Sequence, residues 1–245
     1  FVTDRSIVTN ASVHVGKKVV VNLDLRDFFP TLTFRRTKGL FVSLGYGEHV
    51  ATLLALLTTE PPRVKATFDD AALYVALGER VLPQGAPTSP AITNLVCRSL
   101  DRRLRGLADK HGFAYTRYAD DLTFSGNKDR AVGRLLKSVR AILIDEGFVE
   151  HPDKTKVMRR GRRQEVTGVV VNDRVGVARD QVRTLRAILH NAEKNGLDAQ
   201  NLDGHPSFAA HLRGRIAFVS MVDPAKGLAL AQKLDRVLAA APVRG

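Results

Sequence analysis

A run of alternating apolar residues from Val19 to Leu25 carries a carboxylate, Asp24, close to its end. Side chains alternate between the two faces of a β-strand, so this pattern predicts a strand that brings Asp24 to its end. An unpaired carboxylate is costly to bury at the end of an apolar strand. The strand therefore needs partners for this charge.

A second acidic position lies in a predicted β-hairpin. Phe113 to Arg117 and Leu122 to Ser125 are short β-like runs on either side of Ala119-Asp120-Asp121, which we expect at the hairpin tip. A solvated turn is the ordinary fate of such an acidic pair. If the hairpin lies beside the strand of Asp24, the three carboxylates come together.

Helical spacing of apolar residues covers much of the remaining chain. The predicted helices are Thr33 to Leu44, Glu48 to Leu57, Ala71 to Leu77, Ser89 to Gly112 and Arg130 to Glu146. Asp69-Asp70 would cap the third of these helices. Val166 to Val171 is predicted as a strand. Beyond Arg179 the pattern is helical throughout, so we expect an α+β domain over residues 1–178 and a small helical domain over residues 179–245.

The charge balance favours a nucleic-acid partner. Lys and Arg number 38 against 25 Asp and Glu, which gives a formal net charge of +13 and attracts polyanions. A solvated basic face is the alternative for the basic residues of the helical region, which are Arg179, Arg183, Arg186, Arg213 and Arg215. The single Cys97 excludes an intramolecular disulfide framework and a cysteine-based zinc site. Nothing about this cysteine suggests an oxidising compartment, so we expect a cytoplasmic protein. No apolar run approaches the roughly 20 residues of a membrane span, so we expect no membrane partner.

Clustered carboxylates suit the transfer of a nucleotide. This reaction needs charge neutralisation on the attacking hydroxyl, the reacting phosphate and the leaving pyrophosphate, which two metal ions about 4 Å apart provide. Mg²⁺ prefers oxygen ligands and retains water, so a few Asp side chains and the substrate phosphates form a sufficient site. Asp24, Asp120 and Asp121 meet this requirement.

Three segments resemble the core motifs of reverse transcriptases, in the order in which that family carries them. They are Asn22-Leu23-Asp24-Leu25-Arg26-Asp27-Phe28-Phe29-Pro30, Leu82-Pro83-Gln84-Gly85-Ala86-Pro87-Thr88-Ser89-Pro90 and Tyr118-Ala119-Asp120-Asp121. The resemblance runs from about Arg5 to about Arg236 and implies an RNA-directed DNA polymerase with a right-hand fold. Residues 1–178 would form the palm and part of the fingers, and residues 179–245 the helical thumb.

The resemblance also implies which residues hold the metal ions. Asp24 and Asp120 would be the principal ligands of two Mg²⁺ ions, Asp121 would assist, and the Leu25 carbonyl would complete one coordination shell. These roles come from the family and not from composition or spacing.

The same resemblance implies the residues that contact the substrate. Phe29 would be a steric gate that excludes a 2′-hydroxyl and so selects deoxynucleoside triphosphates. Gln84 and Gly85 would contact the incoming nucleotide and the template. Lys154 would protonate the leaving pyrophosphate, with Lys156 as a rival. A core phenylalanine, a plain turn and solvated lysines are the structural alternatives.

Two further segments resemble signatures of retron enzymes. Asn10-Ala11-Ser12-Val13-His14 matches Asn-Ala-x-x-His, and Val166-Thr167-Gly168 matches Val-Thr-Gly. The resemblance implies that Asn10, His14, Val166, Thr167 and Gly168 recognise a structured noncoding RNA. Synthesis would start from a 2′-hydroxyl of an internal guanosine and give RNA-linked single-stranded DNA (msDNA), in anti-phage defence with a separate effector protein. A loop asparagine, a hydrogen-bonded histidine and a strand-end glycine would explain the same residues.

Other functions remain open at this point. A reverse transcriptase of a group II intron, a diversity-generating element or an abortive-infection system would share the metal site. A basic RNA-binding scaffold with a vestigial polymerase site would keep the charge and the fold without the chemistry. The sequence begins at Phe1 rather than Met, and the family's first fingers segment would lie upstream of it, so we expect N-terminal sequence to be missing.

Overall fold

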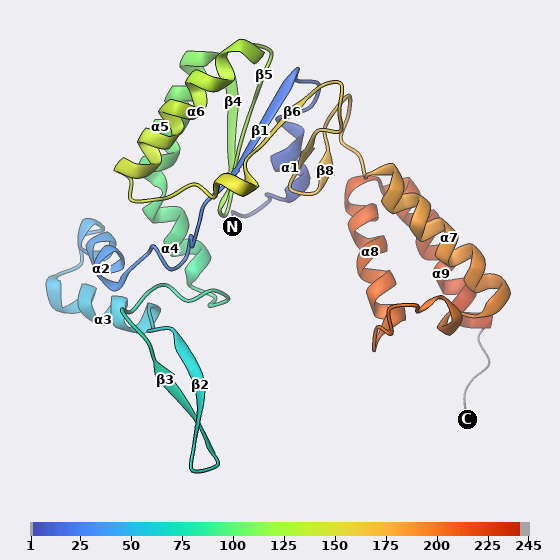
Figure 1. Ribbon diagram of the computed structural model, residues 1–245, viewed down its shortest axis with the longest axis horizontal. Helices are drawn as coiled ribbons and strands as arrows, with labels where there is room; N and C mark the ends of the chain where they lie inside the picture. Colours follow the sequence, from blue (N-terminus) through green and yellow to red (C-terminus); the bar gives the residue numbers. More distant parts are fainter. Residues whose placement is uncertain (1, 241–245) are drawn as a thin grey trace. The chain divides into compact units, whose positions relative to one another are not determined.

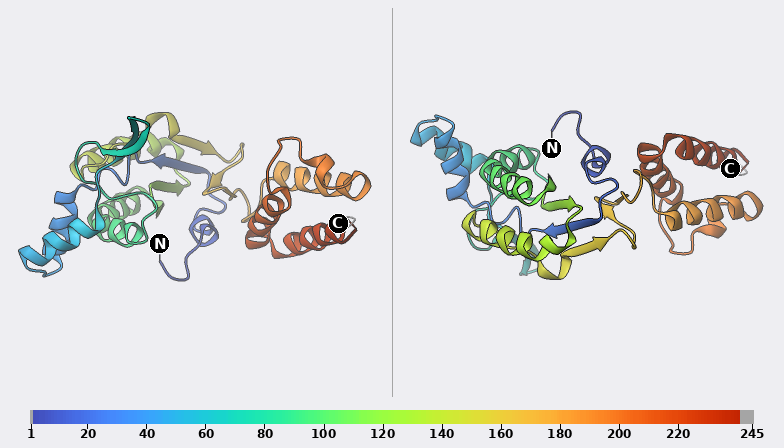
Figure 2. Two further views of the ribbon diagram at one scale, coloured as in Figure 1. Left: turned by 90° about the horizontal axis from the view of Figure 1, so that it is seen from below. Right: turned by 90° about the horizontal axis from the view of Figure 1, so that it is seen from above.

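The computed structural model describes residues 2–240, whose contacts divide the chain into two compact units (Figures 1 and 2). The first unit comprises Phe1–Arg5 and Lys17–Arg159, and the second comprises Ser6–Gly16 and Arg160–Gly245. The boundary expected between residues 178 and 179 falls inside the second unit, where α7 (Arg179–Asn195) begins. None of the helices in residues 2–240 is both long enough and apolar enough to cross a membrane.

A four-stranded antiparallel sheet forms the centre of the first unit (Figure 1). Its strands are β1 (Val19–Asp24), β4 (Phe113–Tyr118), β5 (Asp121–Gly126) and β6 (Lys156–Arg159), in the order β4-β5-β1-β6. The predicted strand and the predicted hairpin are confirmed. Because β1 lies between β5 and β6, its apolar residues are buried, whereas Asn22 and Asp24 are partly exposed.

Helices complete the core of this unit. They are α4 (Ser89–Val96), α5 (Arg98–His111) and α6 (Val132–Asp145), with the short turns η1 (Asp129–Ala131) and η2 (Pro152–Lys154). Leu104 of α5 and Leu135 of α6 share one buried cluster with Phe124 of β5. The single helix predicted from Ser89 to Gly112 is wrong, because the helix breaks at Cys97. The Thr93 hydroxyl donates to two carbonyl oxygens one turn earlier, a contact that often bends helices.

The helix pair α2 (Phe34–Ser43) and α3 (Glu48–Thr58) is confirmed, but the helix predicted from Ala71 to Leu77 is wrong. That segment is β3 (Ala71–Ala76), which pairs with β2 (Arg63–Phe68) in a hairpin. Asp69 and Asp70 have φ angles of 45° and 59°, so they form the left-handed turn and do not cap a helix. The register makes one hairpin face wholly apolar, a period-2 pattern that the helical interpretation overlooked.

The second unit is mainly helical, and the segment beyond Arg179 forms helices. It contains α1 (Ile7–Ser12), β7 (Glu165–Val166), β8 (Val169–Val170), α7, η3 (Asp198–Gln200), α8 (Phe208–Val222) and α9 (Pro224–Ala240). Its core is formed by Leu185, Leu189, Leu212, Ile216, Val219, Leu230 and Leu234. The single strand predicted over Val166 to Val171 is wrong, because Thr167 and Gly168 have φ angles of 48° and 81° and reverse the chain between β7 and β8.

Candidate active site

The three predicted aspartates lie at one end of the central sheet. Asp24 closes β1 and pairs directly with Asp121, the first residue of β5. Directly opposed residues of antiparallel strands place their side chains on the same face, about 4.5–5.5 Å apart at Cβ. Asp120 precedes Asp121 in the hairpin turn, where its carbonyl oxygen accepts a 3.1 Å bond from the Leu25 N–H. The adjacency of β1 and β5 thus brings the three residues together.

The turn that carries Asp120 is held by a side chain that sequence reasoning missed. Arg117 Nη1 donates a 3.1 Å hydrogen bond to the carbonyl oxygen of Ala119. Ala119 has a φ of 54°, a left-handed conformation that costs a non-glycine residue of order 1 kcal/mol. A signal was present in the sequence, because strand alternation puts Arg117 on the same face as the buried Phe113 and Tyr115. An arginine on such a face needs partners.

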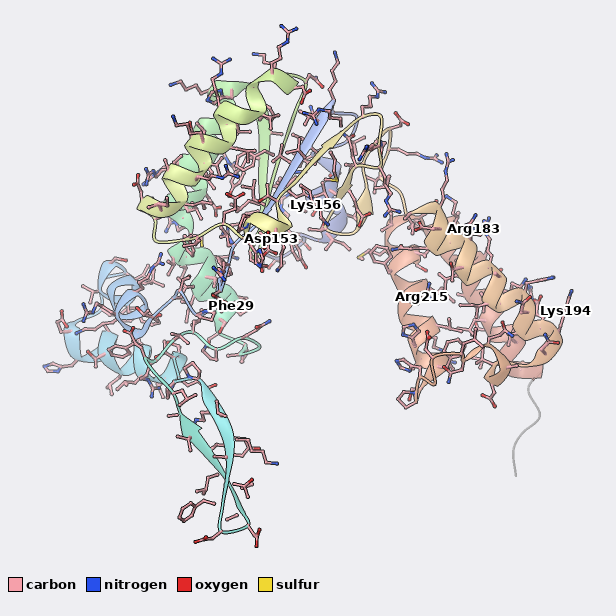
Figure 3. The ribbon with its side chains drawn as sticks, viewed as in Figure 1. Phe29, Asp153, Lys156, Arg183, Lys194 and Arg215 are labelled. Atoms are coloured by element: carbon pink, nitrogen blue, oxygen red, sulfur yellow. The ribbon has the colours of Figure 1, made fainter. Side chains whose placement is uncertain are left out.

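Lys154 reaches the end of β1 from the neighbouring segment. The His151 N–H donates a 2.8 Å bond to the Asp24 carbonyl, which places η2 beside β1. From there Lys154 Nζ donates to Asp24 Oδ1 at 2.9 Å, and the Asp24 side chain is only 18% exposed. Lys156, the alternative candidate for the proton donor, lies on β6 opposite Asn22 (Figure 3). Lys154, and not Lys156, is therefore the lysine in contact with the carboxylate of Asp24.

Negative charge dominates the electrostatics of this end of the sheet. Burial, together with the charges of Asp120 and Asp24, raises the pKa of Asp121 to about 6 against the opposing effect of Lys154 and Lys156. Burial and the charge of Asp24 also raise the pKa of Asp120. The hydrogen bond to Asp24 raises the pKa of Lys154, so the ammonium form is favoured. An added cation would reduce the repulsion between the carboxylates of Asp24, Asp120 and Asp121.

The side-chain chemistry fits a hard divalent cation. Asp24, Asp120 and Asp121 all offer carboxylate oxygens, which are the ligands that Mg²⁺ prefers. Within residues 2–240, no group of three or more His, Cys, Asp or Glu side chains is already arranged as a metal site. The Asp24 carboxylate is paired with the ammonium group of Lys154. The three aspartates are nevertheless the residues that could hold metal ions, since all three offer carboxylate oxygens, and burial and neighbouring carboxylates raise the pKa values of Asp120 and Asp121.

The other predicted substrate contacts lie on two loops. Phe28 is buried in the core, whereas Phe29 is half-buried and packs edge-on against it at 5.4 Å between ring centroids (Figure 3). Gln84 and Gly85 are exposed, and Gly85 has a φ of 91°, which favours glycine. The loop is closed by a 2.6 Å bond from the Ser89 hydroxyl to the Pro83 carbonyl.

The two segments with retron signatures meet in the second unit, although they lie far apart in the sequence. Helix α1 packs against β7 and β8, and the Thr167 hydroxyl donates a 3.3 Å bond to the Ile7 carbonyl. His14 and Val166 are fully buried, so neither side chain is accessible for direct contact with RNA. Asn10 Nδ2 is buried without a hydrogen-bond partner among the described residues.

Comparison with known protein families shows which family contains this chain. Residues 1–191 match the family described as reverse transcriptase (RNA-dependent DNA polymerase). The chain belongs to the reverse transcriptase family. This confirms the resemblance of the three core motifs and assigns to the chain the polymerase fold of that family, built here from helices and an antiparallel sheet.

Several curated reverse transcriptases are similar over nearly the whole chain. The retron Mx162 reverse transcriptase of Myxococcus xanthus is 49% identical over 99% of this chain and 53% of its own length. The retron Mx65 enzyme of the same organism is 46% identical over 95% of this chain and 53% of its own length. The retron Ec86 reverse transcriptase of Escherichia coli is 34% identical over 91% and 62%. The chain thus spans about half the length of the Myxococcus relatives.

Removing one of the repelling charges should stabilise the fold in a pH-dependent way. The raised pKa means that folded Asp121 holds a proton more tightly than unfolded Asp121, so ionisation costs stability as pH rises through about 6. Asp121→Asn should therefore raise the unfolding midpoint Tm at about pH 8 by about 2–4 °C for each kcal/mol relieved, and by less at about pH 5. Thermal denaturation in the presence of a chelator measures this.

The exposed hairpin-tip aspartate serves as the control, because Asp70→Asn should leave Tm unchanged at either pH. An equal gain for Asp121→Asn at both pH values would contradict the charge repulsion.

Proposed function

We propose that this chain forms the polymerase core of a retron-type reverse transcriptase, which extends DNA on a structured noncoding RNA with deoxynucleoside triphosphates and Mg²⁺. The observation that carries the proposal is the pairing of Asp24 with Asp121, beside the turn of Asp120, in a chain of the reverse transcriptase family. Carboxylates fixed on rigid strands suit nucleotidyl transfer, because their oxygens can hold Mg²⁺ against substrate phosphates.

Asp24 and Asp120 are the principal metal ligands in this mechanism, and Asp121 and the Leu25 carbonyl assist. Two bound ions would supply activation of the attacking hydroxyl and neutralisation of the pyrophosphate. The protein itself holds the ligand residues in position. The register of β1 and β5 orients Asp24 and Asp121, and the Leu25 N–H holds the carbonyl of Asp120.

Lys154 is the proposed proton donor to the leaving pyrophosphate. Its ammonium lies 2.9 Å from Asp24 Oδ1, and its raised pKa keeps the proton in place until negative charge develops on the leaving group. Lys156 adds positive charge near Asp121 without the contact to Asp24. Lysine suits this task because its flexible stem can follow the moving phosphate.

The sugar of the incoming nucleotide is proposed to pack against Phe29, with Gln84 and Gly85 beside the nucleotide. Phe29 is half-buried and next to the end of β1, which leaves part of its ring available to a ligand. A ring against C2′ leaves no room for a 2′-hydroxyl. The exposed loop of Gly85 allows close approach of the backbone to the substrate.

The second unit is proposed to bind the RNA, with residues 179–245 as the thumb and residues 1–178 as the palm and part of the fingers. A pocket of about 960 Å³ lies beside β8 and the start of α7. Its basic lining residues are Arg163, Arg174, Arg179, Arg183 and Lys226. They outnumber the acidic lining residues, which are Asp173, Asp180 and Asp223. Arg183 on α7 and Arg215 on α8 are marked in Figure 3. The excess of basic over acidic side chains in the pocket lining suits an RNA phosphate backbone.

The active-site assignment is tested by removing one metal ligand. Asp120→Asn keeps the size of the side chain but weakens its hold on a divalent cation, so it should abolish Mg²⁺-dependent primer extension. The affinity for RNA should change little, because Asp120 is not part of the basic pocket. Extension and RNA binding are measured on the same preparation. Undiminished synthesis by Asp120→Asn would overturn the site, and a full-length protein that binds RNA but synthesises no DNA would favour a scaffold.

The steric gate is tested by the choice between sugars. Phe29→Ala opens the space against C2′ and should increase the incorporation of ribonucleotides relative to deoxynucleotides by about 10-fold or more. Phe28→Leu is the matched control, since Phe28 is buried in the core and should affect stability but not the choice of sugar. Competition between the two nucleotide classes in primer extension gives the ratio. An unchanged ratio in Phe29→Ala would remove Phe29 from the nucleotide site.

The retron type is proposed from the meeting of α1 with the Thr167-Gly168 turn and from the similarity to retron enzymes. Priming from a 2′-hydroxyl, an msDNA product and a separate effector in anti-phage defence follow from that type. Labelled DNA made on the cognate RNA should stay joined to RNA until a debranching enzyme is added. A product that carries an ordinary 3′-linked primer would instead indicate a reverse transcriptase of another bacterial type.

A further inference from the structure

The guanidinium of Arg117 connects helix α5 to the turn between β4 and β5, which carries Asp120. Nε and Nη2 donate to the two carboxylate oxygens of Asp101 at 2.8 and 2.7 Å, and Nη1 donates to the Ala119 carbonyl at 3.1 Å. The Arg117 side chain is 8% exposed. A guanidinium is planar and rigid, so two bonds to Asp101 fix the direction of the third bond. The position of the Ala119 carbonyl is therefore set from α5.

Asp101 is a firm anchor for this connection. Its backbone N–H bonds to the Cys97 carbonyl at 2.8 Å at the start of α5, and Tyr115 Oη donates to its Oδ1 at 2.8 Å. Tyr115 is itself buried against Phe124, with ring centroids 4.9 Å apart. The anchor therefore moves only if the core moves.

The turn needs such support because two effects act to open it. Ala119 is held in a left-handed conformation that alanine disfavours. Asp120 and Asp121 repel each other and Asp24. Besides the ladder pair Tyr118–Asp121 that closes it, the turn is held at two carbonyl groups, that of Ala119 by Arg117 and that of Asp120 by the Leu25 N–H. Loss of the Arg117 contact would leave the Ala119 carbonyl without the bond that holds it from α5.

We propose that Arg117, anchored on Asp101, is a positioning residue that holds Asp120 and Asp121 in the orientation needed for nucleotidyl transfer. Arg117 itself touches neither nucleotide nor metal in this role. The proposal rests on the proposed function of the three aspartates. Its consequence is that substitution of Arg117 lowers the rate of chemistry and loosens metal binding, beyond any effect on folding.

Arg103 provides a matched control, because it lies on α5, the helix that carries Asp101. Its Nη1 donates to Glu146 Oε1 at 2.9 Å and its Nη2 to Asp145 Oδ2 at 2.8 Å, so it ties α5 to the end of α6 rather than to the hairpin turn. Arg103→Met removes a similar set of charged hydrogen bonds. It should change Tm but not the kinetics of the folded enzyme.

The experiment compares Arg117→Met, Arg117→Lys and Arg103→Met in primer extension, with folded fractions measured by thermal denaturation. Arg117→Met should lower kcat about 100-fold, as expected for a misplaced catalytic group, and should raise the Mg²⁺ concentration for half-maximal activity, with little change in the nucleotide KM. Arg117→Lys keeps the charge but not the fork, so kcat should stay low. Asp101→Asn keeps the shape of the anchor and provides a second route if Arg117→Met does not fold, with kcat about 10-fold lower.

Equal kcat for Arg117→Met and Arg103→Met, with unchanged Mg²⁺ dependence, would overturn the positioning role. Full activity of Arg117→Lys would overturn it too, because charge alone would then suffice. These results leave the proposed function standing as long as Asp120→Asn is inactive. Active Asp120→Asn would instead refute the active site itself.

Discussion

Repulsion between carboxylates is the constraint on which the arrangement of the first unit depends. Asp24 and Asp121 face each other across paired strands, Asp120 lies beside them, and the pKa of Asp121 rises to about 6 as a result of burial and of these neighbours. On a mobile loop such groups would move apart. The β1–β5 ladder, the core beneath it and the Leu25 N–H keep them together. The fold thus concentrates negative charge at the place where divalent cations would neutralise it and could hold a triphosphate.

Local patterns in the sequence are sufficient to predict much of this site. Alternation over Val19 to Leu25 specifies β1, and the β-like runs around Ala119-Asp120-Asp121 specify the hairpin, because each pattern is set by neighbouring residues. The motif order then identifies the family, which the match over residues 1–191 confirms. The roles given to individual residues go beyond the fold and remain proposals.

Features that depend on contacts between distant residues are not predictable in this way. Strand β3 resembles a helix when read alone, and only its pairing with β2 shows that Asp69 and Asp70 form a turn. The contact of Arg117 with Asp101 joins a strand to a helix, and that of Thr167 with Ile7 joins residues 160 positions apart in the sequence. Tertiary packing decides these cases, because local propensity is weaker than the burial it competes with.

The central claim is that the aspartates at the end of β1 and β5 bind a pair of divalent ions during DNA synthesis. Electron paramagnetic resonance of Mn²⁺, in a complex of the chain with an RNA template, a DNA primer and a non-hydrolysable deoxynucleotide, tests this most directly. The wild-type complex should show a spin-coupled pair of ions about 4 Å apart, and Asp24→Asn should lose it. A coupled pair that persists unchanged in Asp24→Asn, or the absence of a pair in the wild-type complex of a preparation that is active in primer extension, would contradict this assignment.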